Sequence, residues 1–135
     1  MAQVVMILIT TATLVGAGQK LPFPAGETWW VSQGNQSNSK DDTHRTGSTM
    51  EFAWDFNYPG GADLGRPVLT PSSGKVAKIY RNAGGWGNVV IVDYENGDYG
   101  KFAHLQDILV EEGQRVSLTS TLAPPATFQV AVFRK

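Results

Sequence analysis

The segment "NVVIVDYENGDYGKFAHL", residues 88–105, limits the fold of this chain more than any other. Two runs rich in β-branched and aromatic residues flank the dipeptide Asn96-Gly97. This dipeptide favours the tight turn between two antiparallel strands, because both of its residues tolerate a left-handed backbone. The segment therefore predicts a β-hairpin, and with it a fold that contains an antiparallel sheet.

Glycine and proline divide the sequence after residue 18 into short pieces. The chain has 15 Gly and 7 Pro in 135 residues, and almost no helical periodicity follows the first residues. Extended segments are expected at 28–34, 51–56, 66–70 and 74–81, in addition to the hairpin. A chain of this length forms one domain with a hydrophobic core. The expected fold class is all-β, with one antiparallel β-sheet assembly.

Residues 1–18 form a signal-peptide-like leader. They carry no charge, and an apolar stretch from Val4 to Val15 precedes small residues, so cleavage is expected after Ala17. A truncated membrane anchor and a buried strand are the alternatives, and the stretch is shorter than the roughly 20 residues of a membrane span. The mature protein is therefore expected to be secreted or in the cell envelope (periplasm or cell wall), without a stable membrane span.

Charge and cysteine content exclude several kinds of partner and site. The formal net charge is −1, so no nucleic-acid-binding surface is expected. The chain has no cysteine, which excludes disulfides and thiolate metal ligands. Histidine and carboxylate are the strong metal ligands that remain, and the chain has only two histidines.

These two histidines and one aspartate form the candidate site. His44 lies in the polar stretch 32–50, where it is either a solvated loop residue or a ligand. Asp55 in "AWDF" either caps a backbone amide or faces a groove, because strand alternation separates it from its two aromatic neighbours. His104 ends the predicted hairpin. Two histidines with a carboxylate are a catalytic zinc composition, although spacing alone does not bring the three together.

Several segments in a fixed order resemble the lysostaphin-type zinc metalloendopeptidases of bacterial cell-wall turnover. They are "LPFPAGETWWVSQG", a histidine in a polar loop, "AWDF", "GRPVLTPSSGKV", "GGWGNVVIVDYENGDYGKFAHL" and "VEEGQRV". The resemblance covers residues 21–116. It implies a duplicated hybrid motif of antiparallel strands, a zinc (Zn2+) cofactor and peptidoglycan peptides as the substrate.

The resemblance also implies a role for each candidate residue. His44 and Asp55 correspond to two zinc ligands, and His104 corresponds to a catalytic histidine beside the metal. Phe102 stands where this family usually has tyrosine, which keeps the ring and removes the hydroxyl. The third ligand should come from a downstream His-x-His strand, and this chain has no such motif.

Residues 117–135, "SLTSTLAPPATFQVAVFRK", form a tail without histidine or acid, changed by truncation, frameshift or divergence. The antiparallel assembly is therefore expected to be incomplete at the C-terminus, with "TFQVAVF" able to cover a sheet edge. Without a third ligand, we expect weak zinc binding and little hydrolysis. In one alternative His104 is the third ligand and Glu51, on the face of Asp55, assists it. In a second alternative, the domain catalyses no reaction, and it binds wall peptides or activates a separate hydrolase.

Overall fold

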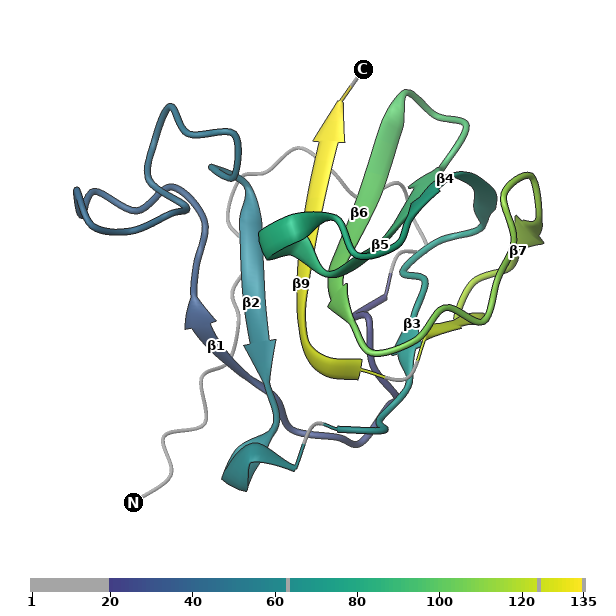
Figure 1. The fold of residues 1–135 in the computed structure, drawn as a ribbon, viewed down its shortest axis with the longest axis horizontal. Helices are drawn as coiled ribbons and strands as arrows, with labels where there is room; N and C mark the ends of the chain where they lie inside the picture. The colour runs from purple at the N-terminus through teal and green to yellow at the C-terminus, as the bar shows by residue number, and fades with distance from the viewer. Residues whose placement is uncertain (1–19, 63, 124, 135) are drawn as a thin grey trace.

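The computed structural model describes residues 20–62, 64–123 and 125–134, and the leader lies outside these ranges. The described residues form two antiparallel sheets and contain no α-helix, so the expected all-β class is confirmed. The large sheet has the strand order β1-β2-β9-β6-β5-β4-β7, and the small sheet pairs β3 with β8 (Figure 1). No helix in the described ranges is long and apolar enough to cross a membrane.

The strands are short, as the dense glycine and proline punctuation predicts. The first five are β1 (Trp30–Gln33), β2 (Ala53–Asn57), β3 (Val68–Leu69), β4 (Gly74–Tyr80) and β5 (Asn88–Asp93). The other four are β6 (Asp98–Leu105), β7 (Arg115–Val116), β8 (Thr121–Ala123) and β9 (Pro125–Arg134). Two 3-10 turns, η1 (Pro59–Gly61) and η2 (Gly84–Trp86), interrupt the connections.

The predicted hairpin is confirmed as β5 and β6, which pair antiparallel. Its loop is one residue longer than a two-residue turn, because the Tyr94 N–H donates to the Asp98 carbonyl at 3.0 Å. Gly97 has a φ of +95°, a left-handed backbone that suits glycine at this position. The Asn96 side chain accepts the Asp98 N–H at 3.0 Å and closes the loop.

The C-terminal tail supplies a central strand of the large sheet. β9 lies between β2 and β6 and pairs antiparallel with both (Figure 1). The expectation that this segment covers a sheet edge is therefore wrong, because an alternating pattern shows that a segment is a strand but not which strands flank it. The backbone of the large sheet is therefore continuous from β2 through β9 to β6.

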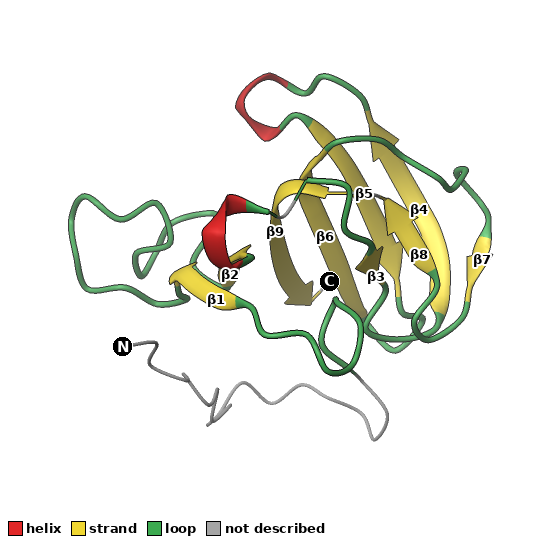
Figure 2. Cartoon of the chain, turned by 90° about the horizontal axis from the view of Figure 1, so that it is seen from below, coloured by secondary structure: helices red, strands yellow, loops and turns green. Residues whose placement is uncertain are grey.

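The hydrophobic core lies between the two sheets (Figure 2). Side chains from one face of the large sheet pack against the small sheet, as in other two-layer domains. Phe102 at the centre of β6 is fully buried in this cluster. The completely buried members of the cluster are Val68, Val90, Val92, Phe102, Leu122 and Ala123. The opposite face of the large sheet carries Ala53 and Asp55, and we call it the site face.

Candidate functional site

Strand alternation in β2 directs the candidate carboxylate away from the core. Trp54 and Phe56 stack with their ring centroids 6.2 Å apart, and Phe56 belongs to the core cluster. Asp55 lies between them in the sequence and therefore projects from the site face, where its side chain is 22% exposed. The predicted separation of Asp55 from its aromatic neighbours is confirmed.

The long polar loop between β1 and β2 brings His44 to Asp55. The His44 side chain is fully buried, and its Nε2 lies 3.5 Å from Asp55 Oδ1. The loop folds back on itself: the Ser37 N–H donates to the His44 carbonyl at 3.2 Å, and the Thr46 N–H donates to the Ser37 carbonyl at 3.1 Å. The alternative in which His44 is a solvated loop residue is therefore wrong.

Asp42 holds the backbone of His44 in place through a hydrogen bond. Its Oδ1 accepts the His44 N–H at 2.7 Å and also accepts from the Gln33 side-chain amide of β1. Hydrogen bonds from the Ser37 hydroxyl and from the His44 N–H lower the pKa of Asp42 below its usual value, because they favour the charged carboxylate. The loop thus has an internal anchor two residues before the histidine.

Glu51 stabilises the same loop through its side chain. β2 begins only at Ala53, so strand alternation does not extend back to Glu51. Its Oε2 accepts the Gly47 N–H at 2.9 Å, and its Oε1 accepts from the Gln36 side chain at 3.5 Å. The expectation that Glu51 shares the face of Asp55 is wrong, because these two contacts turn its carboxylate toward the loop.

His104 occupies an irregular position at the end of β6. The pairing with β9 shifts between Ala103 and Leu105, which marks a bulge, and His104 has a φ of +56°. The imidazole stacks on the indole of Trp86, with centroids 6.2 Å apart and planes inclined by 24°. Its neighbour Ala103 pairs with Gln129 of β9, and Gln129 pairs with Asp55. Ala103, the residue just before His104, therefore lies in the same cross-strand row as Asp55.

The described residues do not fit a catalytic zinc ion with three protein ligands. His44 and Asp55 converge as two ligands would, but no group of three His, Cys, Asp or Glu side chains in the described part of the chain suits a metal. Residues 117–135 contain none of these residue types. A catalytic zinc site keeps three protein ligands and one open position. The alternative in which His104 supplies the third ligand is not seen.

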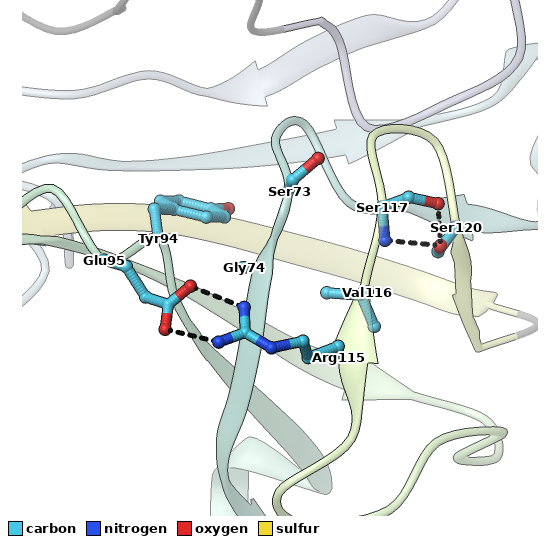
Figure 3. A pocket seen from close by; sticks show the side chains of 8 residues that line it. All are labelled: Ser73, Gly74, Tyr94, Glu95, Arg115, Val116, Ser117 and Ser120. Atoms are coloured by element: carbon cyan, nitrogen blue, oxygen red, sulfur yellow. Dashed lines mark hydrogen bonds and ion pairs between the residues drawn. The ribbon is translucent and has the colours of Figure 1, made fainter.

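A concave region lies at the end of the large sheet opposite to β1 and β2, where β4 meets β7 (Figure 3). Arg115 crosses it and forms a two-pronged ion pair with Glu95, at 2.8 and 3.2 Å. Burial raises the pKa of the Tyr94 phenol that lines it. The lining residues are Ser73, Gly74, Tyr94, Glu95, Arg115, Val116, Ser117 and Ser120. None of them belongs to the His44 loop or to β2, so this region is separate from the candidate site.

The family of this chain follows from a comparison with known protein families. The family model described as Peptidase family M23 matches residues 50–124, which is more than half of the sequence. The chain belongs to peptidase family M23. This family assignment confirms the sequence resemblance. A comparison with curated protein sequences finds no match for this M23 chain.

Solved structures confirm the M23 fold. The NMR structure of lysostaphin has a TM-score of 0.64 and 16% identity, over 79% of this chain and 44% of that chain. A chain from the SpoIIIAH and SpoIIQ complex has a TM-score of 0.69 and 16% identity, over 86% of this chain and 92% of that chain. Helicobacter pylori Csd3 has a TM-score of 0.65 and 15% identity, over 86% of this chain. The M23 chain spans only 30% of the length of Csd3.

Proposed function

We propose that this M23 domain acts on the peptide part of bacterial peptidoglycan, as a zinc endopeptidase of strongly reduced activity, in the cell envelope or outside the cell. His44 and Asp55 are its two zinc ligands, and His104 is its catalytic histidine. The family assignment supports the substrate class. The reduced activity follows from the ligand count, because loss of one ligand weakens the binding of the ion that polarises the scissile carbonyl.

The 3.5 Å approach of His44 Nε2 to Asp55 Oδ1, without a third ligand in the described residues, is the observation that carries this proposal. Burial of an imidazole next to a carboxylate at the end of a long polar loop costs desolvation free energy, which an apolar side chain at the same position would avoid. Buried imidazoles that face a carboxylate across two separate elements are typical of metal and catalytic sites.

The second candidate is a non-catalytic module that binds wall peptides or activates another hydrolase. One structural neighbour comes from a complex of two proteins, SpoIIIAH and SpoIIQ, so a chain of this fold has been observed in a protein assembly. The incomplete ligand set favours the same alternative, because binding to a wall peptide or to a protein does not need the metal.

A turbidity assay on purified peptidoglycan separates the two candidates. With zinc added, we expect a slow loss of turbidity that disappears in Asp55→Asn, which keeps the shape of the side chain and removes its charge. Lysostaphin serves as the active control. The second candidate instead requires no loss of turbidity, together with co-sedimentation of the protein with peptidoglycan in the presence of a chelator. If the protein neither hydrolyses nor co-sediments, the peptidase and the wall-binding module are both wrong, and activation of another hydrolase is the one role left of the second candidate.

A further inference from the structure

We propose that Lys101 and His104, held against the ring of Trp86, form a carboxylate-binding subsite for acidic wall peptides on the site face. The inference rests on the proposed function for the class of ligand, and it adds the chemical group that the domain recognises. Three observations carry it: the environment of the Lys101 ammonium group, the backbone of His104, and the position of both residues relative to Asp55.

Lys101 is a partly buried cation without an acidic partner. Among the described Lys and Arg side chains, only Lys101 and Arg66 are partly buried, and the others are exposed. Arg66 forms an ion pair with Glu27 at 2.8 Å, whereas Lys101 forms none with any described carboxylate. Its Nζ lies 3.2 Å from the centroid of the Trp86 ring. An indole compensates only part of the hydration that a buried ammonium group loses. The Lys101 ammonium group can therefore still bind an anion.

Burial also lowers the pKa of Lys101 below its usual value, because it disfavours the charged form. A bound anion would have the opposite effect and favour the charged form.

His104 is directed onto the same indole by a strained backbone. Five non-glycine residues in the described chain have a positive φ, and His104 is the one among them that lies inside a strand. A left-handed conformation costs a non-glycine residue free energy and occurs often at functional sites. Bulges are known to redirect side chains. Here the bulge after Ala103 coincides with the stacking of His104 on Trp86.

The register of the sheet places this cluster beside the His44 and Asp55 pair. Lys101 pairs with Ala131 of β9, and Ala131 pairs with Ala53 of β2. Residues directly opposite each other in antiparallel strands share a face, so Lys101 lies on the site face with Ala53 and Asp55. Trp86 packs against Met50 and Ala53, and Figure 1 shows η2 in front of β2 and β9. The indole therefore connects the cation to the strand that carries Asp55.

A carboxylate fits these donors better than a neutral amide does. The Lys101 ammonium group is a donor with full charge, and an imidazole N–H of His104 adds a second donor next to the same ring. Hydrogen bonds in which the donor or the acceptor is ionised are about twice as strong as neutral ones, and a carboxylate adds a charge opposite to that of the ammonium group. A peptide with a free carboxylate is therefore preferred over the same peptide with a carboxamide at that position.

The test measures the binding of two matched peptides to the full chain by isothermal titration calorimetry. One is a wall stem peptide with free carboxylates, and the other is the same peptide with carboxamides. A chelator is present, so that no metal at His44 and Asp55 can bind the carboxylate. We expect the free acid to bind about tenfold more tightly. In Lys101→Gln this preference should disappear, and in Lys101→Arg it should persist in part.

Lys75→Gln is the matched control, since it removes the same charge from an exposed lysine of β4. It should leave the preference unchanged. Circular dichroism establishes that each variant is folded. The subsite is wrong if wild type binds both peptides equally, or if folded Lys101→Gln keeps the preference. If neither peptide binds to wild type, peptide binding itself fails, and the proposed function and the subsite are rejected together.

Discussion

Replacing Gln129 by histidine is expected to raise the zinc affinity of the domain by on the order of 100-fold. Gln129 is the direct cross-strand partner of Asp55 on one side and of Ala103 on the other. Directly opposite residues share a face, so position 129 lies on the site face next to the carboxylate that approaches His44. Histidine at this position gives two imidazoles and one carboxylate, which is a complete ligand set for catalytic zinc.

The size of this gain follows from the free energy of zinc binding. A structural site with four ligands binds zinc with about 10–16 kcal/mol, or about 3 kcal/mol for each ligand. Competition with a chromogenic chelator measures the affinity directly. Gln129→Ala is the control for loss of the amide and should bind zinc as wild type does. Adding Asp55→Asn to Gln129→His should remove the gain. An unchanged affinity in the folded histidine variant would show that position 129 does not face the pair.

Phe102→Ala is expected to reduce the free energy of unfolding by about 3–5 kcal/mol. The Phe102 side chain is fully buried in the core cluster beneath the site face. Removing the ring leaves a cavity between the two sheets in addition to the lost burial of apolar surface. Urea unfolding followed by intrinsic tryptophan fluorescence gives the value.

Phe102→Leu, which fills most of the same space, should cost clearly less than the alanine variant. A loss below about 1 kcal/mol for Phe102→Ala would contradict the core position of the ring. The structure places this ring on the core side of β6, whereas Lys101 lies on the site face.

The sequence alone predicted the fold class, the central hairpin and the face of Asp55. These features depend on local chemistry: a dipeptide that tolerates left-handed backbone, and alternation that separates Asp55 from two aromatics. It also selected His44, but it left open whether that residue is solvated. Its burial depends on contacts across the loop, such as the hydrogen bond from the His44 N–H to Asp42, which no local pattern reveals.

The place of the C-terminal strand could not be predicted from its own residues. Alternation in "TFQVAVF" identifies a strand, but pairing with β2 and β6 depends on segments about 70 and 25 residues earlier in the chain. Gln129 was missed for this reason, because its relation to Asp55 exists only through the register. Lys101 was missed as well, although its position next to a core phenylalanine in a strand already directs it to the opposite face.

The dissociation constant of zinc for the wild-type chain tests the central claim most directly, because that claim is a site with only two metal ligands, His44 and Asp55. Competition with a chelator of known affinity, on protein first stripped of metal, gives this constant. With two ligands at about 3 kcal/mol each, or about 6 kcal/mol together, we expect a Kd of about 40 μM, and further weakening in Asp55→Asn. Stoichiometric binding with a nanomolar Kd in the wild-type chain would contradict it.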